Sequence, residues 1–331
     1  MIRRRVFLTR SAAAAIAAAL GPRAVSAEPP PETTTIRLLQ TDSMCQAPQY
    51  VASELLRGEG FTDVRYIRKE GPHAIADALT AGEADINMHF SGPLILRLDT
   101  GAAVTILAGV HVGCYELFAT DRVRTLSDLK GKTVGIRGLR GPEHVFLASM
   151  VSYVGLDPHR DVMWVTYPKE ESIRRLAEGS IDAFMGFPPD PQEPRARKIG
   201  HVVVNSNADR PWSHYFCCVA AAHSEFVRRH PVATKRALRA ILKATDLCAA
   251  EPERASRYLV DSGRTPRYDL ARQVLKEIPY DRWREYDPED TIRFYALRLR
   301  EVGMIKSTPQ KIIANGTDWR FLNELKRELK T

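Results

Sequence analysis

The sequence predicts an α/β protein of two similar lobes, each a sheet flanked by helices, with a ligand cleft between the lobes. Three observations support this fold class. The phrase Leu79–Ile86 returns 97 residues later as Leu176–Ala183, strands and helices alternate with short loops, and two apolar stretches link the halves of the chain. Such alternation predicts parallel sheets covered by helices.

Each copy of the repeated phrase ends an amphipathic helix, turns on Gly82 or Gly179, and enters a short apolar strand. In open α/β sheets, ligands bind beyond the carboxyl ends of the strands. Two such units facing each other therefore predict a binding cleft. The alternative is a chance match, because the order helix, glycine, strand is common.

The first unit is expected to hold three strands and three helices. The strands are predicted at 36–40, 64–68 and 84–90, and the helices at 49–58, 73–81 and 91–101. The apolar stretch 104–120 follows and is interpreted as strand material that crosses toward the second unit.

The second unit opens near residue 126 and repeats the pattern. Strands are predicted up to Arg137 and at 162–167, 181–187 and 201–205, with helices at 142–154 and 169–178 and a proline-rich loop at 188–194. The stretch 213–221 is expected to return to the first unit. The remainder is helical, near 236–245, 251–261, 268–277, 288–302 and 316–329. The predicted lobes are therefore 35–112 plus 217–331, and 113–216.

The first 27 residues have the features of an export signal. Arg4 and Arg5 form a twin-arginine pair, an apolar run follows over 12–20, and the small residues 25–27 suit a cleavage site. The apolar run is shorter than the roughly 20 residues that a spanning helix needs. We therefore predict export to the periplasm by the twin-arginine route, with an uncleaved membrane anchor as the alternative.

Composition argues against nucleic-acid and metal binding. Five arginines and no acid lie in residues 1–27, so the net charge falls from +8 to +3 without them. No basic stripe interleaved with aromatic residues is present. The five cysteines and the scattered histidines show neither zinc-ligand spacing nor an HExxH motif. Neither a metal nor a cofactor is expected.

Several segments resemble the solute-binding proteins of the nitrate/sulfonate/taurine-type ABC importers, a superfamily shared with proteins that bind thiamine pyrimidine precursors. They are Gln49–Ala52, Gly82–Asp85, Leu126–Ile136, Leu176–Ala183 and Phe226–Lys235. The resemblance implies a type II-like periplasmic binding protein that holds one small molecule between two lobes. It also implies delivery to a membrane permease and its ATPase. On this basis we expect a monomer that is not an enzyme.

Two loops of the first lobe are predicted to contact the ligand. The loop after the first strand offers backbone N–H groups at a helix start, which favour an anion or a carbonyl; a simple helix cap by Asp42 or Ser43 is the alternative. The loop after the third strand offers an aromatic ring and a hydroxyl. The candidates are Thr41, Asp42, Ser43, Cys45, Gln46, Phe90, Ser91 and Gly92.

The second lobe is predicted to supply cationic and aromatic groups. Arg137 and Arg140 flank a glycine-rich helix start, which suits a carboxylate, sulfonate or phosphate, although either side chain would equally suit solvent. The candidates are Arg137, Arg140, His144, Phe187, Trp212 and His214. The expected ligands, in order, are a pyrimidine-like or heteroaromatic molecule, a sulfonate or carboxylate, and nitrate or bicarbonate.

Cys45 leaves an enzyme as the alternative function, resembling a desulfinase or a pyrimidine synthase. In a desulfinase of this fold the equivalent loop carries the nucleophilic cysteine, and His73 is placed to match the family's histidine. The family's arginine is missing, because His89 and Phe90 stand at its position. The incomplete pattern favours binding over catalysis.

Overall fold

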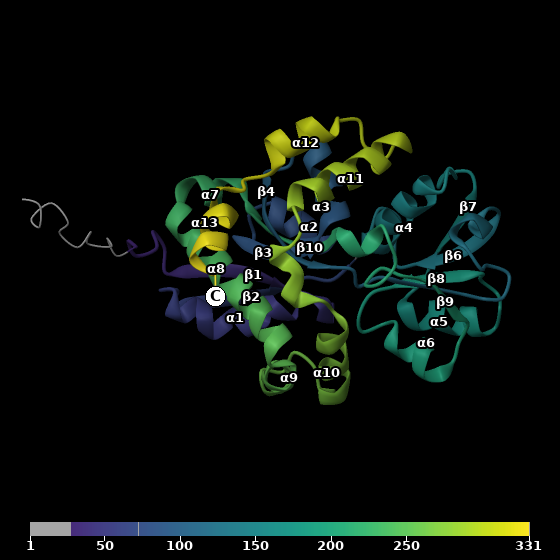
Figure 1. Ribbon diagram of the computed structural model, residues 1–331, viewed down its shortest axis with the longest axis horizontal. Helices are drawn as coiled ribbons and strands as arrows, with labels where there is room; N and C mark the ends of the chain where they lie inside the picture. The colour runs from purple at the N-terminus through teal and green to yellow at the C-terminus, as the bar shows by residue number, and fades with distance from the viewer. Residues whose placement is uncertain (1–27, 72, 331) are drawn as a thin grey trace, which may run out of the picture. The chain divides into compact units, whose positions relative to one another are not determined.

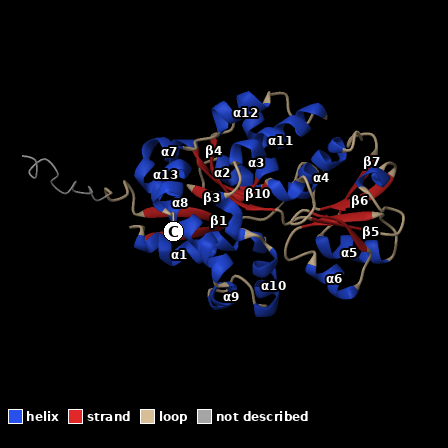
Figure 2. Ribbon diagram, in the orientation of Figure 1, coloured by secondary structure: helices blue, strands red, loops and turns tan. Residues whose placement is uncertain are grey.

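In the computed structural model, residues 28–71 and 73–330 are described, and they carry an α/β fold. Residues Pro31–Thr331 make up one compact unit, and the fold below is that of this unit (Figures 1 and 2). The predicted signal at 1–27 lies outside the described residues. Within the described part, no helix is both long and apolar enough to span a membrane.

The strands of the first unit form two small sheets. Strand β1 (Thr35–Gln40) pairs in parallel with β2 (Asp63–Arg68). The other sheet has the order β3-β10-β4, formed by β3 (Ile86–Phe90), β10 (Phe216–His223) and β4 (Val104–Val112). Strand β10 is antiparallel to both neighbours. The prediction of a purely parallel sheet was therefore wrong here, because the returning strand enters between β3 and β4 from the opposite direction.

Side chains join these two sheets where a backbone ladder is absent. The Asn87 side-chain oxygen accepts a hydrogen bond from the Leu39 N–H at 2.8 Å. The Gln49 side chain donates to the Leu39 carbonyl and accepts from the Met88 N–H, both at 2.9 Å. Both side chains are buried, so these bonds satisfy backbone groups that would otherwise be left unpaired. They hold β1 beside β3.

The second unit is a single five-stranded sheet of order β7-β6-β8-β5-β9. Its strands are β5 (Glu116–Ala119), β6 (Lys132–Ile136), β7 (Val162–Thr166), β8 (Ala183–Gly186) and β9 (His201–Asn205). Helix α4 (Pro142–Tyr153) lies on one side of this sheet, and α5 (Lys169–Ala177) and α6 (Gln192–Arg197) lie on the other (Figure 1). Helix α6 begins inside the segment predicted as a proline-rich loop.

The remaining helices were largely predicted from their apolar periodicity. They are α1 (Ala47–Gly58), α2 (Ala74–Thr80), α3 (Ser91–Asp99), α7 (Ser224–Arg229), α8 (Pro231–Ala250), α9 (Pro252–Asp261), α10 (Tyr268–Glu277), α11 (Pro288–Glu301), α12 (Pro309–Gly316) and α13 (Arg320–Glu328). Helices α8 to α13 come late in the chain, yet they contact the first unit: α8 packs on α1, and α11 packs on α3. Helix α11 also packs on α4 of the second unit.

The two copies of the repeated phrase have the same structure. Each ends a helix, passes through a glycine in the left-handed region, with φ of +74° at Gly82 and +69° at Gly179, and enters a strand. Asp85 accepts the backbone N–H of a neighbouring strand residue at 2.7 Å, and Asp182 does the same at 2.8 Å. In both copies the aspartate N–H donates to the carbonyl of that same residue. The two copies are therefore similar in structure as well as in sequence.

The chain passes twice between the two units. Strand β4 ends at Val112, and β5 begins after Gly113 and Cys114, which have φ of +68° and +114°. A Cβ at Gly113 would lie 2.3 Å from the Asn207 side-chain oxygen, so the turn has no room for a larger residue. The predicted crossing strand is thus two strands with a tight turn between them. The division into lobes at 112/113 and 216/217 stays a prediction.

Candidate ligand pocket

A pocket of about 440 Å³ opens where the strands of both units end. Its walls come from the loops after β1 and β2, from α2, from the end of β3, from the start of α4, and from the residues that follow β6 and β8. Thr41, Asp42, Ser43, Gln46, Arg68, Lys69, Glu70, Gly71, Ile75, His89, Phe90, Arg137, Pro142, Glu143 and Phe187 line it. This is the location that the rule for open α/β sheets predicts.

Half of the predicted contact residues line this pocket. They are Thr41, Asp42, Ser43, Gln46, Phe90, Arg137 and Phe187. The Ser43 side chain makes no capping hydrogen bond to the short helix that follows it. The proposed helix cap at Ser43 is therefore not formed.

The other predicted residues have partners elsewhere. Ser91 is buried and donates its hydroxyl to the Phe216 carbonyl at 2.7 Å, and Gly92 packs against Val145. The backbone N–H of Arg140, whose side chain is exposed, donates to His144 Nδ1 at 2.9 Å.

Three aromatic or imidazole groups of the second unit are packed away from the pocket lining. The His144 ring meets Trp164 edge-on, and burial lowers its pKa to about 4. The Trp212 ring packs edge-on against Phe146 and Phe294, and the His214 ring stacks on Tyr286. Cys45 is buried behind Ser43 and belongs to a separate cluster.

Arg137 is the centre of a charged group in the pocket wall. Its guanidinium donates to Asp190, a fully buried carboxylate, and lies 3.2 Å from a Glu143 oxygen. The same guanidinium sits 4.4 Å from the centre of the Phe187 ring, a distance that allows a cation–π interaction. Arg137 therefore lines the pocket, but two acids already balance its charge.

Burial changes the ionisation of the acids around Arg137. It raises the pKa of Glu143 to about 7, although the Arg137 charge opposes the rise. The Asp190 pKa is raised for the same reason, against the same cation. Among the described residues, neither Glu143 oxygen has a hydrogen-bond partner, since the approach of Arg137 lacks the required geometry. Glu143 is thus a buried acid whose hydrogen-bonding capacity is unused.

Aromatic rings close one side of the pocket. The Phe90 and Phe187 rings contact each other, with their centroids 4.7 Å apart, and the Tyr115 ring packs against both. Phe90 and Phe187 are only 4% and 5% exposed, so each is a largely buried residue of the pocket wall. His89 follows the same wall, and its Nδ1 is buried without a partner among the described residues.

The end of β2 and the loop that follows it were not among the predicted contact segments. Arg68, Lys69, Glu70 and Gly71 line the pocket, and β2 is parallel to β1. Ligands bind beyond the carboxyl ends of parallel strands, and this rule applies to β2 as it does to β1. The predicted end of the second strand was therefore enough to identify this loop. Glu143 was missed for another reason: its position directly after a helix-starting proline gave no indication that it would be buried.

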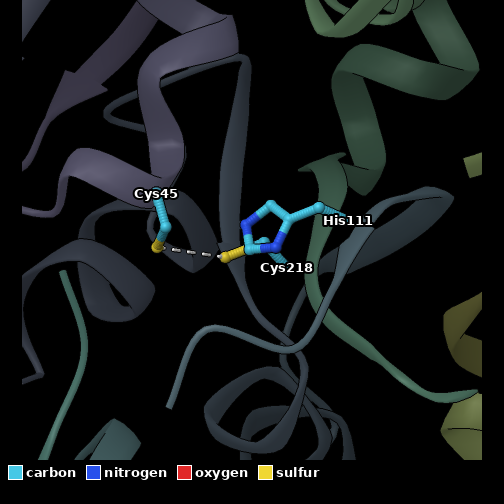
Figure 3. A group of neighbouring side chains, drawn as sticks. All are labelled: Cys45, His111 and Cys218. Atoms are coloured by element: carbon cyan, nitrogen blue, oxygen red, sulfur yellow. Dashed lines mark hydrogen bonds between the residues drawn. The ribbon is translucent and has the colours of Figure 1, made fainter. Parts of the chain in front are cut away.

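A second group of side chains, Cys45, His111 and Cys218 (Figure 3), lies next to Ser43 of the pocket lining. The sulfur of Cys45 lies 3.9 Å from that of Cys218, and His111 points toward both. All three residues are fully buried. Burial raises the pKa of Cys45, but interactions with the nearby Cys114 and Cys218 thiols and the His111 ring outweigh it, so the thiol pKa is well below its usual value. His111, and not His73, is therefore the histidine beside Cys45.

Residues 29–259, more than half of the chain, match the NMT1-like family. The chain belongs to the NMT1-like family. Among curated proteins, the bicarbonate-binding protein CmpA of Synechococcus elongatus is 27% identical over 110 residues. This match covers 33% of the chain but only 24% of that relative, so the chain spans about a quarter of the length of the curated relatives it matches.

Solved structures share the fold over nearly the whole chain. The periplasmic nitrate-binding protein NrtA from Synechocystis PCC 6803 superposes with a TM-score of 0.76 and 14% identity, covering 91% of this chain and 90% of that one. The periplasmic aliphatic sulphonate binding protein SsuA from Escherichia coli gives 0.66 and 15%, over 85% and 91%. The fold predicted for this NMT1-like protein, that of periplasmic binding proteins, is confirmed.

The relatives named above are binding proteins, which agrees with the prediction that this NMT1-like protein is not an enzyme. Their names describe what those proteins bind. At identities near 15%, the structural likeness carries over the fold and not the ligand.

Proposed function

We propose that this protein is the periplasmic solute-binding component of an ABC import system and that it delivers one small organic molecule to a membrane permease and its ATPase. The observation that carries the proposal is the pocket of about 440 Å³ at the strand ends. A concave site of this size, with aromatic walls and a few polar groups, suits a small ligand. The named relatives and structural neighbours support the transport role.

The charge balance of the pocket favours a ligand without strong negative charge. Among the described lining residues, three are basic and three are acidic. Arg137 is paired with Asp190 and Glu143, and Arg68 lies 3.2 Å from Glu70. A small inorganic anion would need a free positive charge, whereas the lining cations named here are already paired with carboxylates. The pocket therefore suits a neutral or weakly basic molecule better than nitrate or bicarbonate.

Glu143 gives the ligand its chemical class. It lines the pocket beside the Phe90 and Phe187 rings, and its two buried oxygens have no hydrogen-bond partner in the described part of the chain. An aminopyrimidine presents a ring nitrogen beside an amino group, and a carboxyl group can pair with both. With a pKa of about 7, Glu143 can serve as a carboxylate or as a carboxylic acid in this pair. We therefore favour a flat, nitrogen-containing heteroaromatic ligand.

The predicted division into two lobes, 35–112 plus 217–331 and 113–216, belongs to this proposal. The ligand would lie between the lobes, and closure would be a hinge motion about the two crossings. The protein would act as a monomer.

A thermal-shift screen of the purified protein tests the proposal. The panel is a set of aminopyrimidines, an alkyl and an aryl sulfonate, nitrate and bicarbonate. A ligand at 100 times its dissociation constant should add about 2.7 kcal/mol of stability. Titration calorimetry of Glu143→Leu should then show binding weakened by about 10-fold to 100-fold, because a hydrogen bond to a charged group contributes about 1.5–3 kcal/mol.

Arg140→Ala is the matched control, since its side chain is exposed beside the same helix and does not line the pocket. It should bind the ligand as the parent does. Stabilisation by sulfonate or nitrate alone, unchanged in Glu143→Leu, would contradict the heteroaromatic assignment and favour an anion. Steady product formation from any panel compound would favour the enzyme alternative and contradict a purely binding function.

A further inference from the structure

We propose that Cys45, Cys218 and His111 form a binding site for a thiophilic metal ion, best matched by Zn²⁺. The three residues come from the loop after β1, from β10 and from β4 (Figure 3). One ligand atom from each can be chosen so that all lie within 4.8 Å of one another. Two thiolates and an imidazole are a common zinc ligand set.

The distances fit a shared ion. Zinc–sulfur bonds are about 2.3 Å long, so two sulfurs on a tetrahedral ion lie about 3.8 Å apart. The Cys45 and Cys218 sulfurs are 3.9 Å apart. Binding would therefore require little movement of either side chain.

His111 has the arrangement typical of a metal-binding histidine. Its Nδ1 lies 3.3 Å from the Val112 carbonyl. Its Nε2 is buried and has no hydrogen-bond partner within the described part of the chain. Metal-bound histidines usually donate one ring N–H to a carbonyl or carboxylate and bind the ion through the other nitrogen. Here Nε2 is the nitrogen left to bind.

Charge favours a divalent ion. The three residues are 0% exposed, and a net charge at such a site is costly. Two thiolates and a neutral imidazole carry two negative charges, which Zn²⁺ cancels; the thiol protons of Cys45 and Cys218 leave for solvent as the ion binds. A monovalent ion would leave one negative charge buried.

Ser43 connects this site with the pocket. Its hydroxyl oxygen lies 2.9 Å from the Cys45 sulfur, and Ser43 also lines the pocket. An ion would thus be separated from the pocket by a single small side chain. This gives a short route for metal entry and leaves an oxygen close to a fourth coordination position.

The test uses the full chain without a histidine tag, reduced and stripped of metal by a chelator. We expect Zn²⁺ to bind with one-to-one stoichiometry in titration calorimetry. Co²⁺ should give thiolate-to-cobalt charge-transfer bands and the visible bands of a tetrahedral ion. Cys45→Ser, Cys218→Ser and His111→Ala should each lower the affinity by more than about 100-fold, because loss of a group that only hydrogen-bonds to a metal ligand already lowers it about 10-fold to 100-fold.

Cys248→Ser is the matched control, since Cys248 is equally buried but lies on α8, outside the cluster. It should bind zinc as the parent does. X-ray absorption spectroscopy of the zinc-loaded parent identifies the atoms bound to the ion, and this test does not require the variants to fold. We expect two sulfur atoms among the zinc ligands. A reduced parent that does not bind zinc, a shell without sulfur, or full affinity in all three variants would overturn the proposal.

Discussion

Replacing Arg137 by alanine tests whether the charged group in the pocket wall is held together as the structure indicates. Arg137 lies between two acids, Asp190 and Glu143, whose side chains are 0% and 1% exposed. Its removal leaves both carboxyl groups buried without their main cation. The variant should therefore lose stability, whatever ligand the protein binds.

The size of the loss follows from the surroundings. Breaking a buried ion pair by removing one partner costs about 3–5 kcal/mol. Two features place Arg137→Ala at the low end of that range. Lys169 Nζ stays 3.6 Å from an Asp190 oxygen, and Glu143 can take up a proton because its pKa is already about 7. We expect a loss of about 3 kcal/mol at pH 8 and a smaller loss at pH 5, where Glu143 is neutral.

Urea unfolding at both pH values measures this effect. Arg140→Ala provides the control, because its side chain is exposed and makes none of these contacts; its stability should stay within about 0.5 kcal/mol of the parent. If Arg137→Ala is as stable as Arg140→Ala at pH 8, the acids do not depend on Arg137. The description of the pocket wall as a balanced charged group would then fail.

Three further changes test other parts of the site. The parent should lose about 3 kcal/mol of unfolding free energy as the pH rises from 4.5, the pKa of Glu143 in the unfolded state, to about 7, its pKa in the folded state, because the buried ionised form is disfavoured. Glu143→Gln should remove this part of the pH dependence in urea unfolding. An unchanged pH dependence would assign it to other groups. Gly92→Ala should lower the free energy of unfolding by about 1–3 kcal/mol, since a Cβ there lies 2.6 Å from Val145 Cγ1. Gly58→Ala, whose Cβ has no atom within 4 Å, should raise it by about 0.5 kcal/mol. Equal urea midpoints for the two variants would count against close packing at Gly92. Phe187→Ala should weaken binding of the panel ligand by about 2-fold to 10-fold in calorimetry, because it removes one aromatic wall, and unchanged affinity would mean that the ring does not contact the ligand.

The repeated phrase was the most informative part of the sequence, and its physical basis is now clear. Both copies need a left-handed glycine after a helix and an aspartate that binds the backbone of the neighbouring strand. Such local requirements restrict residue type at fixed spacing. They can therefore be recognised in a single sequence, together with the strands that follow and the pocket at their ends.

Features that depend on distant parts of the chain were harder to predict. Strand β10 enters between β3 and β4, and nothing in its apolar sequence indicates an antiparallel partner on each side. The burial of Glu143 and its pairing with Arg137 likewise depend on how α4 packs against the pocket. In both cases tertiary contacts decide the outcome, and local propensity does not contain them.

The cysteine–histidine cluster shows the same limit for the proposed metal site. Its residues are at positions 45, 111 and 218, so no local spacing links them, and the sequence predicted no metal. Zinc motifs are recognisable when their ligands come in close pairs along the chain. Here three separate elements, the loop after β1, β4 and β10, bring single residues to one point.

The loop after β1 is where the proposed ligand, the proposed metal and the two units of the fold meet. Ser43 lines the pocket and contacts the Cys45 sulfur, while the Met44 N–H donates to the Pro188 carbonyl of the second unit at 3.0 Å. The Phe90–Phe187 contact lies in the same region. Any separation of the two sets of strand ends would break that hydrogen bond and that ring contact. A ligand or ion bound at this loop would therefore act on the contacts that link the two units, so we expect the two proposed sites to be coupled in binding.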